Sequence, residues 1–422
     1  MHMLSKETIR AVVAEQRKEL LASPFGIERE GLKGLEKLFG RTALIILGIR
    51  RCGKSTLFRQ FISKKFKDDD FLYFNIDDER RAGMKTEDLN NVLECLYELF
   101  GEKRALFFDE IQNVHGWELF VNRLMRGGKR VCITGSNSSL LSKELGSRLT
   151  GRYIDFELTP FSFSEFVKSR QMEFTPAESY ETANKAKLAA LFSEYMENGG
   201  FPQVALRQEN LKILQNIYQN ILYQDIAKRH RVKDTAELAQ IGLFLISNSA
   251  KPVSFRSICA NFGIKSPATA GKYLSYFEDA YLLFTVGMFS YSLKTQARNP
   301  KKVYCIDTGL ANQNSFSFSK DGGRRLENAV AIHLMRKYGK IYYFTTSSGK
   351  EVDFVVQERD NVTHLIQVCA DPSDFATKKR EEKALEEAKK ELGCKNAFIV
   401  TADFESDGKI KYVPAWKWML EK

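Results

Sequence analysis

The clearest pattern in the chain is a set of short apolar runs separated by amphipathic segments. Three runs, residues 43–47, 105–108 and 131–133, contain only apolar residues and have the length of strands. Such runs are typical of strands that are buried on both faces of a parallel sheet. Residues 57–66 instead place their apolar side chains at helical spacing. This pattern predicts an α/β fold with a parallel sheet.

A glycine-rich turn joins the first apolar run to the helical segment. It reads GIRRCGKST and matches the pattern G-x-x-x-x-G-K-[ST] at every fixed position. Such a turn points backbone N–H groups into one concavity beside a helix N-terminus, so it holds a polyphosphate. Lys54 would reach the β- and γ-phosphates of ATP, and the Ser55 hydroxyl would complete the shell of a Mg²⁺ ion. The expected nucleotide contacts are Gly48, Ile49, Arg50, Arg51, Cys52, Gly53, Lys54, Ser55 and Thr56. The alternative is a glycine turn in a purely structural strand–helix unit.

Two acids, Asp109 and Glu110, directly follow the second apolar run. Carboxylates at the end of a buried strand are costly unless they hold a cation. Asp109 is therefore expected to bind the Mg²⁺ through water, and Glu110 to polarise the attacking water. Taken alone, the pair would also fit a helix N-terminus stabilised by the helix dipole. The glycine-rich turn upstream favours the metal-binding interpretation of Asp109 and Glu110.

The third apolar run ends in a polar turn, residues 134–137, which reads TGSN. In the expected sheet this turn lies beside the strand of Asp109. It would point a hydroxyl or an amide at the γ-phosphate, and Asn137 is the candidate amide. A helix cap by Ser136 or Ser138 explains the turn equally well.

Arg148 and Arg152 lie just beyond that turn. Either is a candidate arginine finger, supplied to the nucleotide of a neighbouring subunit. The alternative is a pair of ordinary surface arginines, which are common.

Several segments resemble one family of prokaryotic proteins. They are GIRRCGKST, LFFDEIQNVHGWELFVNRL, ITGSNSSLLS, LTGRYIDFELTPFSFSEF and NGGFPQV, and the likeness runs from about Gln16 to about Thr401. They resemble AAA-type P-loop ATPases with a C-terminal domain of unknown function that ends in a PD-(D/E)XK nuclease-like module. The resemblance implies ATP hydrolysis and implies little about the biological task.

Changes of pattern suggest where the domains lie. Residues 1–39 are expected to form a leading helix and connector, in which Arg29 lies at the surface or, alternatively, near the nucleotide base. Residues 40–158 form the α/β nucleotide domain. Residues 159–233 are helical and end one helix at Gly199-Gly200, which indicates a lid or connector. A lid that closes over the nucleotide is the usual way to convert loss of the γ-phosphate into motion.

Residues 234–312 predict three helices followed by two strands that flank a basic loop. This is the order of a winged helix, with Ser254 and Ser266 as caps of the second and third helices. The residues expected to meet DNA phosphates are Lys272, Lys294, Arg298, Lys301 and Lys302. The alternative is a protein–protein module, because the third helix also carries Glu278 and Asp279.

Residues 320–422 predict a helix, a hairpin, a strand and a long helix, an order that resembles the nuclease-like core. In an active member, the resemblance implies, Glu327 and Asp353 bind a metal with the acid of an E-x-K triplet whose lysine aligns the water. Here Gln367 and Cys369 replace the acid and the lysine. Glutamine is a weaker ligand for Mg²⁺, and cysteine cannot supply a fixed positive charge.

We therefore expect a degenerate domain that is kept for binding or assembly and does not cleave DNA. In that interpretation Glu327, Glu351 and Asp353 are ordinary surface acids.

Composition adds little to this picture. The chain has 64 Lys and Arg against 53 Asp and Glu, a net charge of +11, which suits a polyanion such as double-stranded DNA but is also common. Seven cysteines without a C-x-x-C pair indicate reduced thiols in a cytoplasmic protein, with neither a zinc site nor disulfides. No apolar run approaches the roughly 20 residues that span a bilayer, and the N-terminus lacks a signal-peptide core, so no membrane is expected.

Three classes of function stay open. The preferred one is an ATP-hydrolysing switch or motor, monomeric or oligomeric, whose C-terminal modules engage DNA or a protein partner. The others are an ATP-regulated endonuclease and a nucleotide-gated signalling protein with slow turnover. Turnover rate separates the first from the third, and plasmid nicking in Mg²⁺ or Mn²⁺ tests the second.

Overall fold

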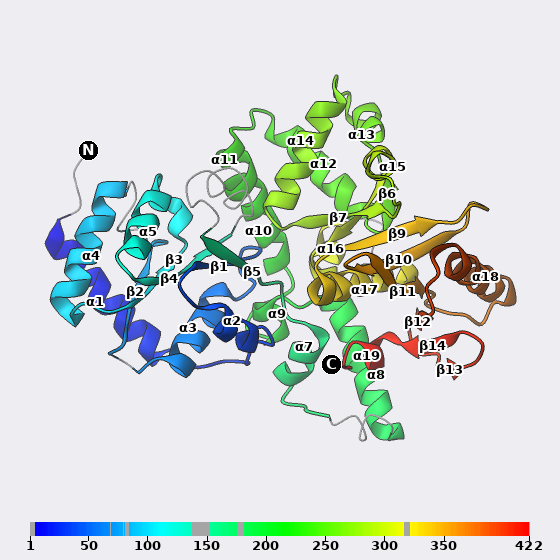
Figure 1. The fold of residues 1–422 in the computed structure, drawn as a ribbon, viewed down its shortest axis with the longest axis horizontal. Helices are drawn as coiled ribbons and strands as arrows, with labels where there is room; N and C mark the ends of the chain where they lie inside the picture. The colour runs from blue at the N-terminus through cyan, green and yellow to red at the C-terminus, as the bar shows by residue number, and fades with distance from the viewer. Residues whose placement is uncertain are drawn as a thin grey trace. The chain divides into compact units, whose positions relative to one another are not determined.

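The chain consists of two compact units. The computed structural model describes residues 5–67, 69–78, 80, 84–136, 152–174, 181–315 and 321–421. Unit 1 is Met1–Thr159 and unit 2 is Pro160–Lys422; Figure 1 shows their helices and strands. Within the described ranges, no helix has the length and apolar character needed to cross a membrane.

A parallel sheet is the centre of unit 1. Its strands, among the residues described, are β1 (Ala43–Leu47), β2 (Phe71–Asn75), β3 (Ala105–Asp109), β4 (Arg130–Gly135) and β5 (Tyr153–Glu157). They are ordered β2-β3-β4-β1-β5, and every pairing is parallel, which confirms the predicted α/β fold. β1 and β3 are buried along their whole length, as their uninterrupted apolar runs predict. Because the strands are parallel, the carboxyl ends of β1, β3 and β4 meet at one edge.

Helices and an aromatic cluster fix the geometry around this sheet. The helical segments that the structure describes in unit 1 are α1 (Lys6–Ala22), α2 (Leu32–Leu38), α3 (Lys54–Lys65), α4 (Thr86–Phe100), η2 (Ile111–Asn113) and α5 (Trp117–Arg126). Phe58 and Phe61 of α3 pack with Phe39 and Phe66 around Phe107 of β3. These ring contacts hold α3, which begins at the glycine-rich turn, against the strand that ends at Asp109.

One sheet runs through most of unit 2. Its strands in the described part of the chain are β6 (Lys251–Val253), β7 (Leu283–Met288), β8 (Lys301–Cys305), β9 (Ile341–Thr345), β10 (Glu351–Glu358), β11 (Asn361–Val368), β12 (Ala397–Thr401), β13 (Ser406–Asp407) and β14 (Lys411–Pro414). Their order is β13-β14-β12-β11-β10-β9-β7-β8-β6. β7 and β9 pair in parallel, with Gly287 opposite Tyr342. The strands predicted for residues 234–312 and for residues 320–422 therefore share a single sheet.

The helices of unit 2 lie around this sheet and in the part of the chain that precedes β6. As far as the structure describes them, they are α7 (Phe163–Ser169), α8 (Thr182–Asn198), α9 (Pro202–Ala205), α10 (Ile213–Asn220), the π-helical η5 (Ile221–Ala227), α11 (Lys228–His230), α12 (Thr235–Ser247), α13 (Phe255–Phe262), α14 (Pro267–Asp279), α15 (Leu293–Arg298), α16 (Thr308–Asn314), α17 (Gly322–Tyr338), α18 (Phe375–Leu392) and α19 (Ala415–Trp418). Ser254 and Ser266 cap α13 and α14 as predicted, since each hydroxyl accepts a backbone N–H of its helix. The segment predicted as a basic loop between β7 and β8 instead contains α15. The winged-helix class of residues 234–312 stays a prediction.

A buried carboxylate closes the turn at the end of α8. Gly199 has φ +75°, and a Cβ there would lie 2.1 Å from Oδ1 of Asp307, so the position requires glycine. The Asp307 carboxylate accepts the backbone N–H of Gly200 at 2.6 Å and of Leu310 at 2.8 Å. Burial raises the pKa of Asp307 to about 6, although these backbone donors oppose the shift. The turn that ends α8 is thus tied to the start of α16.

Candidate functional site

The glycine-rich turn lies between β1 and α3, as predicted. Gly53 has φ +100° and Gly48 has φ +150°, two conformations that side chains rarely adopt. A Cβ on Gly48 would lie 2.0 Å from the Leu158 carbonyl oxygen, so the turn must begin with glycine. Ile49 and Cys52 are buried inside the turn. The backbone N–H groups at the start of α3 are thereby placed at the carboxyl edge of the sheet.

Lys54 is folded back onto the turn from which it projects. Its ammonium donates to the carbonyl oxygens of Gly48 at 3.1 Å and Ile49 at 3.3 Å and lies 3.5 Å from a carboxylate oxygen of Glu110. Only 4% of the side chain is exposed. Burial alone would lower the pKa of Lys54, but the Glu110 carboxylate and other neighbours raise it above its ordinary value. Lys54 is therefore a buried, charged cation at the mouth of the turn.

Asp109 is fully buried at the end of β3. The Thr134 hydroxyl, from the end of the adjacent β4, donates to its Oδ1, and the Tyr73 hydroxyl lies 3.4 Å from Oδ2. Burial and the nearby Glu110 raise the pKa of Asp109, whereas hydrogen bonds from Thr134 and Ser55 lower it. The Ser55 hydroxyl and the Asp109 carboxylate are thus within hydrogen-bonding reach. Both supply the oxygen ligands that Mg²⁺ prefers, so the pair fits the predicted metal shell.

Glu110 has a strained backbone and an ionised side chain. Its φ of +52° lies in the left-handed region, where a non-glycine residue costs free energy and often marks a functional site. Its N–H donates to the Thr134 hydroxyl at 2.9 Å, and the Gln112 amide donates to its carboxylate. Burial opposes ionisation, but Lys54 and Gln112 hold the pKa of Glu110 below its ordinary value. A carboxylate that must polarise water needs this charged form.

Two partners of these acids were missed from the sequence. Thr134 was considered only as part of a turn that faces the γ-phosphate, whereas its hydroxyl bonds to Asp109 and Glu110. Gln112 follows Glu110 by two residues, and its amide also lies 3.4 Å from the Ser136 hydroxyl. The available signal was their position in sequence, because Thr134 lies near the carboxyl end of β4 and Gln112 lies in η2, directly after the paired acids.

Arg29 is buried, which differs from the position expected from the sequence. It was expected at the surface, yet only 3% of it is exposed. Its guanidinium donates to the Cys52 carbonyl of the glycine-rich turn at 2.8 Å and to the Thr159 carbonyl at 2.7 Å. Its backbone N–H donates to Gln60 at 3.1 Å. Arg29 therefore joins the turn to the segment that follows β5, and the contact pairs residues far apart in sequence.

Three further residues were predicted for this site. Asn137 and Arg148 lie outside the described residues. Arg152 is exposed and directly precedes β5, where its carbonyl accepts the N–H of Ala43 at 3.0 Å. Of the two candidate fingers, Arg152 is the one whose position is known, and its role stays a prediction.

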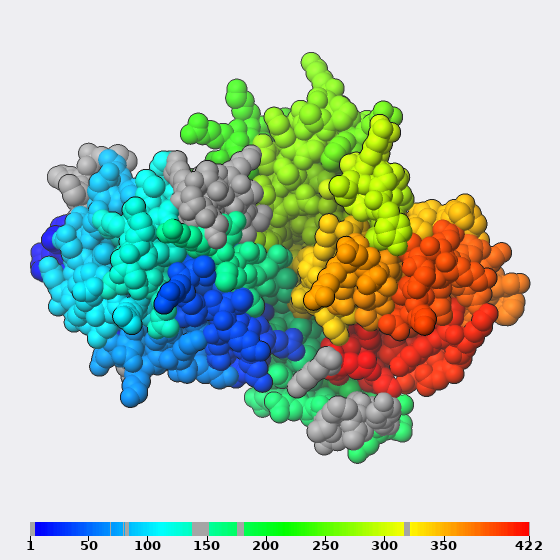
Figure 2. Space-filling model, viewed as in Figure 1, coloured from blue at the N-terminus to red at the C-terminus, as the bar shows by residue number. Residues whose placement is uncertain are grey.

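The basic residues predicted to contact DNA fall into two groups. Lys272 on α14, Lys294 and Arg298 on α15, and Lys301 on β8 are exposed; the segment with α15 forms a yellow-green part of the surface of unit 2 in Figure 2. Lys302 is different, because only 2% of its side chain is exposed and it forms ion pairs with acids of its own unit. The prediction that Lys302 contacts DNA is therefore wrong.

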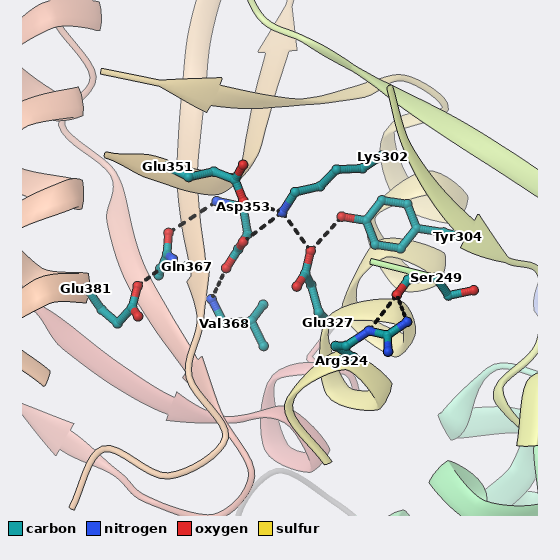
Figure 3. Close-up of polar contacts among 10 residues, drawn as sticks. All are labelled: Ser249, Lys302, Tyr304, Arg324, Glu327, Glu351, Asp353, Gln367, Val368 and Glu381. Carbon is teal, nitrogen blue, oxygen red and sulfur yellow. Dashed lines mark hydrogen bonds and ion pairs between the residues drawn. The ribbon is translucent and has the colours of Figure 1, made fainter. Parts of the chain in front are cut away.

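The acids of the predicted degenerate nuclease site are not ordinary surface acids. Glu327 and Asp353 are largely buried, and Glu351 is 41% exposed; all three pair with Lys302 (Figure 3). Gln367 is buried and donates its amide to Glu381 at 2.6 Å. Cys369 lies in an apolar core.

Comparisons with known families divide the chain in three. Residues 40–167 match the model of an AAA domain, residues 189–320 match a domain of unknown function, DUF8612, and residues 322–418 match another, DUF4143. The uncharacterized protein MJ1544 of Methanocaldococcus jannaschii is 37% identical over 405 residues, which cover 91% of this chain and 89% of that protein. The chain belongs to the family of MJ1544.

Two further similarities are to a second uncharacterized protein and to a solved structure. An uncharacterized protein of Haemophilus influenzae is 31% identical, with 76% of this chain and 81% of that protein covered. Among solved structures, AMPPCP-bound DnaA from Aquifex aeolicus is 16% identical, and the match covers 59% of this chain and 85% of that chain at a TM-score of 0.28.

Proposed function

We propose that the chain binds MgATP at the glycine-rich turn and hydrolyses it, and that it acts as a switch or motor. One observation carries the proposal: Lys54, Glu110 and the Ser55–Asp109 pair converge at the carboxyl edge of a parallel sheet. A cation, an ionised carboxylate and a set of hard oxygen ligands beside one helix N-terminus are the parts that phosphoryl transfer requires.

Each residue has a separate role in this proposal. The backbone N–H groups of residues 48–56 hold the phosphates, and Lys54 leaves its carbonyl partners to contact the β- and γ-phosphates. Ser55 and Asp109 hold Mg²⁺, Asp109 through water, and the ion supplies positive charge that offsets the charge developing on the phosphates. Glu110 polarises the attacking water, and Thr134 and Gln112 fix where it points.

The Lys54–Glu110 contact supports a switch as well as a catalyst. In the structure the ammonium serves the turn's own carbonyls and faces Glu110. A γ-phosphate would attract Lys54 and leave the Glu110 carboxylate free to engage water, so nucleotide occupancy changes the partners of both groups. Unit 2 would then engage double-stranded DNA or a protein partner according to the nucleotide state.

The test is the rate of phosphate release with and without double-stranded DNA, over a range of protein concentration. We expect turnover by the wild type and none by Lys54→Ala, which loses the cationic clamp. Acceleration by DNA would identify the polyanion as a partner. ATP binding with negligible turnover in every condition would contradict the motor and favour a nucleotide-gated signalling protein.

A further inference from the structure

A second charged cluster lies in unit 2, apart from the nucleotide site. Lys302 of β8 points its ammonium at three carboxylates, and the distances are 2.9 Å to Glu327 of α17, 2.7 Å to Glu351 and 3.0 Å to Asp353, both of β10 (Figure 3). The Tyr304 hydroxyl, from the same strand, donates to the same Glu327 oxygen at 2.7 Å. Three carboxylates from two segments that are distant from Lys302 in sequence therefore converge on its ammonium.

Strand periodicity explains the convergence. Lys302 and Tyr304 are two residues apart on β8, so they share one face of that strand. Glu351 and Asp353 both reach the Lys302 ammonium from β10, whose pairing with β9 shifts register between Val352 and Val355. α17 packs against both strands and brings Glu327 to the meeting point. The residues of the cluster thus lie on two strands and a helix rather than on loops.

A further layer of hydrogen bonds holds Asp353 in place. Its Oδ2 accepts the backbone N–H of Val368 at 3.0 Å, and its own N–H donates to the Gln367 side-chain oxygen at 3.1 Å. The Gln367 amide in turn donates to Glu381. Gln367 therefore supports the cluster from β11, while its oxygen is already engaged by backbone.

Lys302 supplies one positive charge, which offsets part of the charge of the three carboxylates. Carboxylates that are removed from water need a compensating cation, and no single carboxylate here could be left unpaired cheaply. Burial alone would lower the pKa of Lys302, but Asp353, Glu327 and Glu351 raise it far above its ordinary value. The ammonium is therefore charged at every physiological pH.

The geometry points to an internal replacement for a metal ion. We propose that the Lys302 ammonium is the resident cation of this carboxylate cluster and that it excludes divalent cations from it. In the wild type this carboxylate cluster is then a metal-free site. The residue that occupies it, Lys302, comes from outside residues 320–422.

Removal of the ammonium should open the cluster to a divalent ion. Carboxylate oxygens bind Mg²⁺ and Ca²⁺ at about 2.0–2.6 Å, whereas the three oxygens lie 2.7–3.0 Å from Nζ. A small inward shift of each would therefore complete half of a hard-oxygen shell, with water as the remaining ligands. Mn²⁺ accepts the same ligands and is the more convenient probe.

The experiment compares Lys302→Met with the wild type in the full chain, without nucleotide. Methionine keeps an unbranched chain of similar length and removes the charge. Both proteins carry Asp109→Asn, which takes the nucleotide site out of the comparison, and Lys301→Met is the matched control on the exposed neighbour. We expect Lys302→Met to bind Mn²⁺ by calorimetry at least tenfold more tightly than the wild type and to gain about 5 °C in melting temperature at a hundredfold excess over Kd.

Two results would overturn the proposal. One is a wild type that binds Mn²⁺ as tightly as Lys302→Met and loses that binding on Glu327→Gln, since the lysine would then exclude nothing. The other is a Lys302→Met protein without any response to Mn²⁺. If that variant aggregates both with and without Mn²⁺, the test passes to Lys302→Gln, which also removes the charge and keeps all three acids. Failure of this second protein to bind Mn²⁺ has the same meaning. The outcome is independent of whether the chain hydrolyses ATP.

Discussion

The Lys54 ammonium lies 3.5 Å from the Glu110 carboxylate while it also donates to two carbonyl oxygens of its own turn. The cation proposed to clamp the phosphates and the carboxylate proposed to polarise water therefore form one ion pair. In the proposed mechanism, a bound γ-phosphate would separate the two groups. The contact predicts separate consequences for binding and for hydrolysis.

Glu110→Gln should bind ATP with little loss of affinity and hydrolyse it at least 100-fold more slowly. Glutamine fills the same space but cannot accept a proton, and general-base roles of this kind are worth about 10²–10⁴ in rate. Filter binding and single-turnover hydrolysis measure the two effects separately. Wild-type turnover by this variant would assign the water to another residue.

Arg29→Met should weaken ATP binding about tenfold and also destabilise unit 1. Two buried carbonyls, those of Cys52 and Thr159, would lose their donor, at a cost of about 1–3 kcal/mol each. The exposed Arg41 supplies the control, as Arg41→Met. Calorimetric ATP titration and thermal unfolding distinguish the effects, and a destabilised protein with unchanged ATP affinity would limit Arg29 to a structural role.

If Arg152 is a finger supplied to a neighbouring subunit, specific ATPase activity should rise with protein concentration. A mixture of Arg152→Ala and Glu110→Gln should then recover part of the activity that each lacks. Activity that stays constant down to a dilute monomer would exclude supply from a second subunit.

The stability of unit 2 should fall between about pH 4 and pH 6 because of Asp307. Its pKa is raised by burial to about 6 in the folded state, so the folded chain holds this proton more tightly than the unfolded chain does. The stabilisation is complete below the unfolded value and is lost as pH rises through 6, a change of about 3 kcal/mol. Asp307→Asn should remove this dependence in thermal unfolding at several pH values, and exposed Asp407→Asn should leave it intact.

DNA binding, if it uses α15, should weaken steeply with salt. Lys294→Gln with Arg298→Gln should reduce the slope of log affinity against log salt by about two and affect all sequences alike. The matched control neutralises Lys379 and Lys390, two exposed lysines on α18. Equal effects of the two pairs would show nonspecific attraction, and binding without salt dependence would point to a protein partner.

Local patterns were sufficient to predict that the residues of the proposed nucleotide site come together. The apolar run before Gly48 and the run before Asp109 each specify a buried strand, and parallel strands must bring their carboxyl ends together. No long-range information is needed to place Lys54 beside Glu110. The helix caps Ser254 and Ser266 are local in the same sense.

Contacts between distant segments were the part that could not be predicted. Arg29 and Lys302 resemble surface residues in sequence, because each is a basic residue in a polar stretch. Their burial depends on carbonyls and carboxylates supplied by segments up to 130 residues away. The one local hint for Lys302 was its strand position, which places it on the same face as the buried Tyr304.

The pairing of β7 with β9 bears on whether the two sequence domains of unit 2 can be inherited separately. Sequence families divide unit 2 near residue 321, yet that division passes through a molecule whose strands on both sides belong to one sheet. A gene that kept only the earlier part would encode a chain with an open strand edge at β7 and an unmatched lysine at position 302. Recombination at this point should therefore be selected against, and the two domains should be found together in genomes as one evolutionary unit.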